Sequence, residues 1–141
     1  MTEQLSPLAL QALAVVEESG AIIGANHAHP HTIRHKGRID LVTETDIAVE
    51  AFLKERLATL APHAGFLAEE SAEDLSLPDT CWIIDPVDGT TNFAHGLPLT
   101  VTSVAYRLNG EIVLGIVNAP LLRECFIAEK GKGAWRNGER I

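Results

Sequence analysis

The sequence predicts an α+β domain in which two helices are followed by a largely antiparallel sheet. Three observations predict this class: helical spacing of apolar residues in the first part of the chain, strand-like apolar runs in the second part, and turn signals between those runs. Helices that come first and strands that follow favour an α+β layout over an alternating α/β one. We expect residues 1–141 to form a single domain.

The first helix is expected to begin at Ser6 and Pro7, because serine caps helix N-termini and proline suits the first helical position. Leu10, Leu13 and Val16 follow at helical spacing. These signals predict a helix that runs to about the end of the first apolar stretch, near residue 26.

The segment 27–40 is expected to be a loop, because it is polar and contains Pro30 and Gly37. A metal site in this loop is disfavoured, since no cysteine or carboxylate partner lies at useful spacing from its histidines. We therefore expect the histidines to be solvated. They are His27, His29, His31 and His35.

The second helix is expected to start near Thr43 or Thr45, either of which can cap it, and to stop before Pro62. Glu44 and Asp46 would then lie in the first turn, where the helix dipole favours anions.

The strands are expected in five runs after the second helix. Asn109-Gly110 predicts a tight hairpin turn between two of them. The runs are GFLAEE (65–70), DTCWIIDP (79–86), LTVTSVAYRL (99–108), EIVLGIVNAP (111–120) and RECFIAEKGKGAWRNGERI (123–141).

The formal net charge of −8 argues against a nucleic-acid partner, since a phosphate backbone requires a basic face. Cys81 and Cys125 lie in strand-like runs without metal-ligand spacing and are expected to be buried thiols of a reducing compartment. No basic region of a signal peptide begins the chain, and no apolar run is expected to reach membrane-spanning length. A cytoplasmic location is therefore expected.

Residues 82–93, WIIDPVDGTTNF, place Asp85 and Asp88 where an apolar strand is expected to stop. Two carboxylates held this close repel each other unless a cation lies between them. Hard oxygen ligands with no histidine or cysteine beside them favour Mg²⁺ or Mn²⁺ over zinc. From these residues alone, a turn capped by the two aspartates stays open as the alternative.

The residues after Asp88 add an anion site to this acidic turn. Residues 89–92 can start a helical turn, whose exposed N–H groups bind an anion such as phosphate. Further acidic positions occur at Asp46 and at Glu69-Glu70. Together the acidic and anion-binding features predict metal-assisted hydrolysis of a phosphate ester.

The run from Asp85 to Phe93, DPVDGTTNF, resembles the metal-binding signature of the inositol monophosphatase family. The segments 40–46 (DLVTETD), 66–71 (FLAEES) and 130–138 (KGKGAWRNG) are similar to three further motifs of that family. The resemblance covers nearly the whole chain. It implies the N-terminal half of a layered αβαβα sandwich. It also implies a Mg²⁺-dependent phosphomonoesterase that hydrolyses a small sugar or inositol phosphate by a metal-activated water.

The resemblance also implies the metal ligands, for two or three Mg²⁺ ions. Glu69, Asp85 and the main-chain carbonyl of Val87 are expected to hold one ion, and Asp85 and Asp88 to share a second. Glu69 is also implied as a catalytic residue. Glu70 is implied as a supporting group or a ligand of a third ion.

The same resemblance implies how the water and the substrate are held. Thr90 and Asp46 are expected to hydrogen-bond the attacking water and help remove its proton. Gly89, Thr90 and Thr91 are expected to bind the phosphate. Lys36 matches a lysine of the family's mobile active-site loop.

The chain departs from the family pattern in two ways. Ala68 stands where the family has a glycine before the glutamate pair. The W-D-x-A-A-G segment, whose aspartate completes the second metal site in the family's second half, does not occur. We therefore expect either a fragment of a longer protein or a natural half-length relative, weak or inactive as this chain. A full-length protein would form a homodimer by this resemblance.

Two alternatives to an inositol phosphatase stay open. One is a catalytically silent metal-binding or subunit-interaction module. The other is a related phosphatase that acts on fructose 1,6-bisphosphate, a nucleotide bisphosphate or histidinol phosphate.

Overall fold

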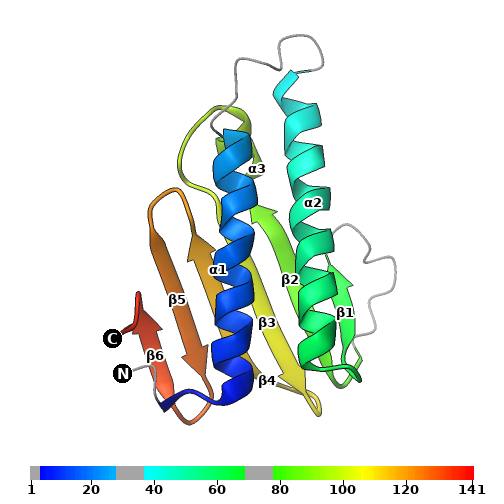
Figure 1. Cartoon of the computed structure of the whole chain (residues 1–141), viewed down its shortest axis with the longest axis vertical. Helices are drawn as coiled ribbons and strands as arrows, with labels where there is room; N and C mark the ends of the chain where they lie inside the picture. Colours follow the sequence, from blue (N-terminus) through cyan, green and yellow to red (C-terminus); the bar gives the residue numbers. More distant parts are fainter. Residues whose placement is uncertain (1–3, 28–36, 69–77) are drawn as a thin grey trace.

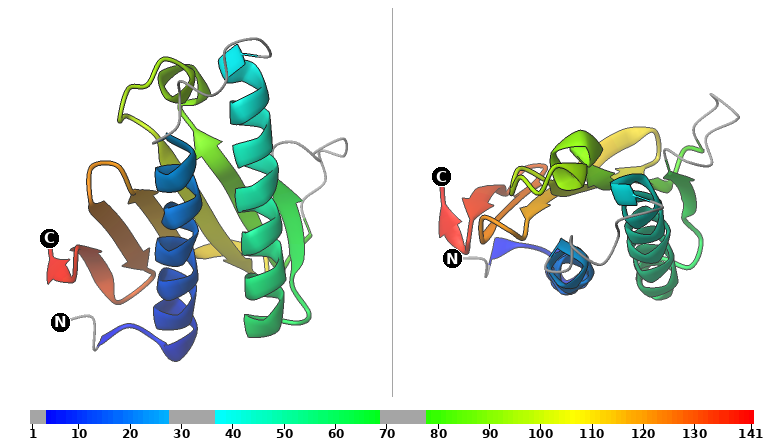
Figure 2. Two further views of the ribbon diagram at one scale, coloured as in Figure 1. Left: turned by 45° about the horizontal axis from the view of Figure 1, so that its top comes forward. Right: turned by 90° about the horizontal axis from the view of Figure 1, so that it is seen from above.

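The computed structural model describes residues 4–27, 37–68 and 78–141, and for residues 37–43 the backbone alone. Two long helices, α1 (Pro7–His27) and α2 (Gly37–Leu60), lie side by side over one face of the sheet (Figure 1). Viewed from above, both helices lie on the same side of the strands (Figure 2). The predicted α+β class, with two N-terminal helices on a largely antiparallel sheet, is confirmed.

Strands that are consecutive in the described chain are neighbours in the sheet, and from the second strand onward they form an antiparallel meander. The first two strands pair in parallel, and each later pair is antiparallel. A short helix, α3 (Thr90–Ala94), connects the second strand to the third. The strands are β1 (Gly65–Ala68), β2 (Cys81–Asp88), β3 (Val101–Leu108), β4 (Glu111–Ala119), β5 (Glu124–Glu129), β6 (Gly133–Arg136) and β7 (Glu139–Arg140).

The start of α1 is capped as predicted. The Ala9 N–H donates to Oγ of Ser6 at 3.2 Å, which satisfies one of the free donors at the helix start. The Ser6 hydroxyl donates in turn to the carboxylate of Glu129 at 2.5 Å. This contact attaches the start of α1 to the end of β5.

The predicted boundaries of the segment 27–40 are wrong at both ends. His27 still belongs to α1, and α2 begins at Gly37 instead of near Thr43 or Thr45. The run after Gly37 contains no proline or second glycine, so nothing in it prevents the helix from extending back to this residue. His29, His31, His35 and Lys36 lie outside the described residues.

The expectation that no run reaches membrane-spanning length is also wrong. By length and composition α1 could cross a membrane, with a mean hydropathy of 1.4. A core helix passes the same test, and here several side chains of α1 are buried against the sheet and α2. Its buried residues are Ala9, Ala12, Val15, Val16, Ser19, Gly20 and Ile23.

The main core lies between the helices and the sheet. Alternate residues of the strands face the helices and are buried, as expected for period-2 side chains. The core residues of the central strands are Trp82, Ile84, Val104, Tyr106, Leu114, Ile116 and Ile127.

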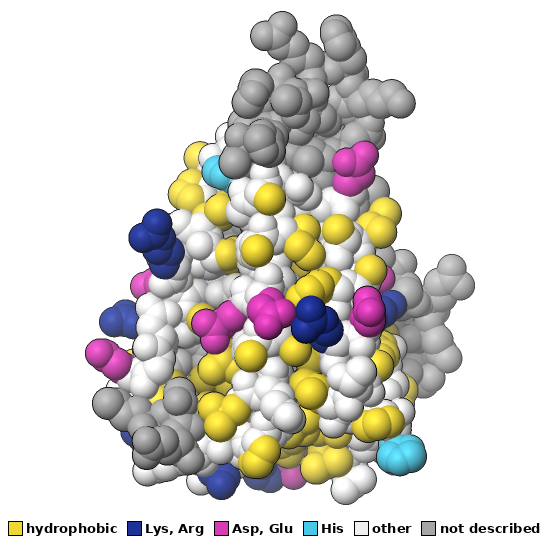
Figure 3. Space-filling view, viewed as in Figure 1, with side chains coloured by type: hydrophobic (Ala, Val, Ile, Leu, Met, Phe, Trp, Pro, Cys, Tyr) yellow, Lys and Arg dark blue, Asp and Glu magenta, His cyan; other side chains and the backbone are white. Residues whose placement is uncertain are grey.

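The outer side of the helices is mixed in character. Charged side chains lie across the middle of α1 and α2, among hydrophobic ones (Figure 3). An ion pair joins the two helices: the guanidinium of Arg56 in α2 lies 3.3 Å from the carboxylate of Glu18 in α1. Both partners are exposed, so the ion pair adds little to stability.

The predicted burial of the two cysteines and the predicted hairpin turn are confirmed. Cys81 and Cys125 are free and buried. Burial raises the pKa of the Cys125 thiol to about 12, and the negative charge of Glu17 acts in the same direction. Asn109 and Gly110 have φ values of 51° and 84°, which is the left-handed backbone that a tight β3–β4 hairpin requires.

Candidate active site

The second strand continues past the point where the sequence predicts its end. It runs through Pro86 to Asp88, because the pairing with β3 contains a bulge. Asp85 pairs with Ser103 and Asp88 pairs with Val101, so β2 has one residue more than β3 between these pairs. A proline is tolerated in a central strand at such a bulge, where the hydrogen-bond ladder is interrupted.

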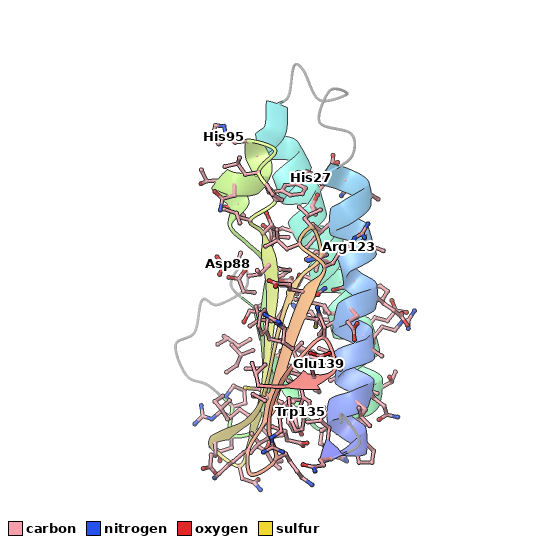
Figure 4. All side chains as sticks on the ribbon, turned by 90° about the vertical axis from the view of Figure 1, so that its left-hand side faces the viewer. His27, Asp88, His95, Arg123, Trp135 and Glu139 are labelled. Carbon is pink, nitrogen blue, oxygen red and sulfur yellow. The ribbon has the colours of Figure 1, made fainter. Side chains whose placement is uncertain are left out.

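The bulge brings the two carboxylates to the same face of the sheet. Ser103 and Val101 are two residues apart on β3 and therefore face the same side, and so do their partners Asp85 and Asp88. In a regular strand, residues three apart would face opposite sides. Figure 4 shows Asp88 on the side of the sheet that faces away from α1.

The bulge is held by a buried hydrogen bond. Oγ1 of Thr102 donates to the carbonyl oxygen of Pro86 at 2.8 Å. Thr102 has no exposed surface, and the next residue, Val87, is also buried. The main chain around Val87, whose carbonyl is a predicted ligand, is therefore anchored from β3.

The described residues fit a hard divalent cation. Asp85 is half-buried, with its Oδ1 atom buried, and Asp88 is exposed on the same face. Two carboxylates beside a main-chain carbonyl form an oxygen donor set of the kind that Mg²⁺ prefers. The part of the chain that the structure describes contains no group of three His, Cys, Asp or Glu side chains close enough for a metal. The predicted ligands Glu69 and Glu70 lie outside that part.

The helical turn after Asp88 is confirmed. Gly89 has a left-handed φ of 91° and precedes α3, and the Phe93 N–H donates to its carbonyl oxygen at 2.9 Å. Thr90 and Thr91 form the start of this helix with exposed side chains. The predicted phosphate-binding residues are thus brought directly beside Asp88.

The chain after α3 folds back onto Gly89. The side chain of Asn92 donates from Nδ2 to the carbonyl oxygen of Leu99 at 2.9 Å, and the Leu97 N–H donates to the Asn92 carbonyl at 2.8 Å. A Cβ atom on Gly89 would lie only 2.6 Å from that same Leu99 oxygen. Residues 89–99 therefore form a closed loop that holds α3.

Asp46 approaches this region from α2. Its side chain is 9% exposed, and α2 packs against both β2 and α3. Thr45, the residue before it, is fully buried and accepts a hydrogen bond at 2.7 Å from Nδ2 of Asn26.

Sequence reasoning missed the side chains that support the site. The prediction that His27 is a solvated loop residue is wrong, because its ring contacts Phe93. Asn26 and Thr102 carried no sequence signal, since their partners are distant in the chain. Among these supporting residues, Asn92 did carry a sequence signal, because it is a polar residue within the motif that follows the two aspartates.

These features define a class: an α+β protein with an acidic site on one face of a bulged strand, followed at once by a left-handed glycine and a helical turn. The model of the inositol monophosphatase family matches residues 4–141. The chain belongs to the inositol monophosphatase family.

Named relatives agree with this assignment. The chain is 46% identical over 134 residues to an inositol monophosphatase of Dictyostelium discoideum, covering 92% of this chain and 49% of that protein. It is 46% identical over 102 residues to a fructose-1,6-bisphosphatase/inositol-1-monophosphatase of Thermotoga maritima, covering 72% of this chain and 39% of that protein.

A solved structure shows the same fold. The structure of inositol monophosphate-bound SaIMPase-II matches with a TM-score of 0.74 and 27% identity, covering 91% of this chain and 45% of that one. The chain thus spans about half the length, or less, of the relatives that it matches.

Proposed function

We propose that this chain carries the metal- and phosphate-binding part of a Mg²⁺-dependent phosphomonoesterase that acts on a small sugar or inositol phosphate. The observation that carries the proposal is the bulge in β2, which turns Asp85 and Asp88 to one face immediately before Gly89 and α3. Family membership and the names of the relatives support the same reaction.

In this proposal Asp85, Asp88 and the Val87 carbonyl hold Mg²⁺, with Glu69 as a further ligand and Glu70 in support. Two or three such ions, when bound, would polarise the phosphoryl oxygens and lower the pKa of a water molecule.

The chain's own groups hold the substrate and the water. Main-chain N–H groups at Gly89, Thr90 and Thr91 bind the phosphate oxygens, because they have no partner within so short a helix. The hydroxyl of Thr90 and the carboxylate of Asp46 hydrogen-bond the water and help remove its proton, which the carboxylate takes up. Lys36 is proposed to support the site, as the family resemblance implies.

The substitution Asp88→Asn, made in the full natural protein, tests the proposal. It removes one ligand charge with little change of shape, so Mg²⁺ affinity and phosphate release from inositol 1-phosphate are expected to fall about a hundredfold or more. Calorimetric Mg²⁺ titration and a phosphate-release assay measure the two effects. Glu139→Gln, an exposed acidic residue of β7, is the matched control and is expected to change neither.

Near-normal turnover of the Asp88→Asn variant in the presence of Mg²⁺ would overturn the proposal. The second candidate is a silent metal-binding or subunit-interaction module. A wild-type protein that binds Mg²⁺ but releases no phosphate from inositol 1-phosphate or fructose 1,6-bisphosphate would support that candidate. Fructose 1,6-bisphosphate belongs in the assay because the Thermotoga maritima relative is named for it.

A further inference from the structure

The last turn of α1 contacts both elements that carry the proposed water-activating residues. Asn26 reaches α2 and His27 reaches α3, although the two residues are adjacent in the chain. Neighbouring residues of a helix point about 100° apart, so one turn can bind two different partners.

His27 contacts α3 (Thr90–Ala94) at Phe93 and the turn that follows it at Gly96. Its Nε2 atom lies 3.1 Å from the carbonyl oxygen of Gly96, and because a carbonyl only accepts, Nε2 is the donor. Its ring centroid lies 5.9 Å from that of Phe93 with the planes tilted by 49°, a favourable aromatic arrangement. Phe93 is 4% exposed and its N–H donates to the carbonyl oxygen of Gly89, the residue before Thr90, so the ring contact is linked to the start of α3.

Asn26 holds α2 at the residue before Asp46. Its Nδ2 atom donates to Oγ1 of Thr45 at 2.7 Å, and Thr45 has no exposed surface. Water cannot readily replace a hydrogen bond to a buried side chain, so this contact resists local movement of α2.

The contacts matter because Asp46 and Thr90 lie on different elements. The five residues of α3 are too few for a helix that is stable by itself, so its orientation depends on its neighbours. Although α2 and α3 touch each other, contacts from the end of α1 to both further restrict the relative position of the catalytic groups that they carry.

We propose that Asn26 and His27 are positioning residues that hold α3 in a fixed position relative to α2; we call this pair of contacts the lock. The lock keeps Thr90 and Asp46 close enough to contact the same water molecule. This inference rests on the proposed phosphatase function. It concerns residues outside the acidic motif, in the turn that ends α1.

Hydrogen exchange tests the lock without any assay of activity. In the His27→Ala variant, exchange of the Phe93 and Leu97 amides is expected to accelerate about tenfold, because α3 loses a hydrogen bond and a ring contact. His27→Phe keeps a ring and His27→Gln keeps an N–H donor, so each is expected to restore part of the protection. His63→Ala, at an exposed histidine after α2, is the matched control.

Steady-state kinetics test the positioning role. His27→Ala and Asn26→Ala are each expected to lower kcat about tenfold while KM stays within about twofold, because the orientation of the water changes and the phosphate contacts do not. His27→Gln is expected to recover part of the lost kcat. His63→Ala is expected to match the wild type.

Unchanged exchange of Phe93 and Leu97 in His27→Ala would overturn the lock. Faster exchange with an unaltered kcat would overturn the positioning role. A wild-type protein that neither binds Mg²⁺ nor releases phosphate would instead overturn the proposed function, and exchange alone would then decide whether α1 holds α3.

Discussion

Gly89 is the residue at which the acidic strand passes into the helical turn. Two separate constraints act on it: its φ of 91° is costly for any side chain, and a Cβ atom would meet the Leu99 oxygen at 2.6 Å. Gly96 has a similar φ of 75°, but nothing lies within 4 Å of its Cβ position. A comparison of substitutions at Gly89 and Gly96 therefore separates the cost of backbone strain from the cost of a steric clash.

Substitution of each glycine by alanine measures these two terms. Gly96→Ala is expected to lower the free energy of unfolding by about 1 kcal/mol, from strain alone. Gly89→Ala adds a clash with the main chain and is expected to cost about 3 kcal/mol or more. Urea unfolding of both variants gives the comparison. Equal losses would show that the close approach of Leu99 does not constrain Gly89.

The element that decides the geometry of the site is β2 with its bulge. Thr102 and Thr100 lie in the same region of the chain and are both fully buried, but their hydroxyls differ. Thr102 donates to Pro86, whereas Oγ1 of Thr100 has no hydrogen-bond partner among the described residues. Only the first hydroxyl can hold the bulge.

Valine substitution tests the hydrogen bond that holds the bulge. Thr102→Val leaves the buried Pro86 carbonyl without this donor and is expected to lower the free energy of unfolding by about 1–3 kcal/mol. Thr100→Val removes a buried hydroxyl that makes no such bond, so it is expected to be neutral or stabilising. Denaturant unfolding measures both changes. A greater loss for Thr100→Val would contradict the assignment.

At the scale of the whole molecule, the sheet has two unlike faces. Ile116 faces the helices and is 1% exposed, whereas its neighbour Val117 faces the other side and is 38% exposed. Viewed from above, α1 and α2 both lie on one side of the sheet (Figure 2). The helix-covered side therefore supplies most of the core.

Truncation at these two adjacent positions tests this asymmetry. Ile116→Ala creates a cavity in the core under α1 and is expected to cost about 2–5 kcal/mol of unfolding free energy. Val117→Ala removes partly solvated methyl groups and is expected to cost less than about 1 kcal/mol. The free energies of unfolding from chemical denaturation check both values. A comparable cost at Val117 would show that its face is also tightly packed.

Local signals in the sequence predicted much of the fold. Ser6 and Pro7 marked the start of α1 because capping acts within one turn. Asn109-Gly110 marked the β3–β4 hairpin because its left-handed backbone is a local requirement. The start of α2 at Gly37 was missed because threonine and acidic residues that resemble a cap can also lie inside a helix.

The sequence by itself determined the chemistry of this protein: the α+β order of elements, the pair Asp85 and Asp88, the glycine after them, and membership of its family. Only the tertiary structure decided the geometry. The bulge opposite Thr102 turns both aspartates to one face, and the end of α1 reaches α2 and α3. The physical reason is that residue types and turns are local properties, whereas strand register and helix contacts join residues that are distant in the chain.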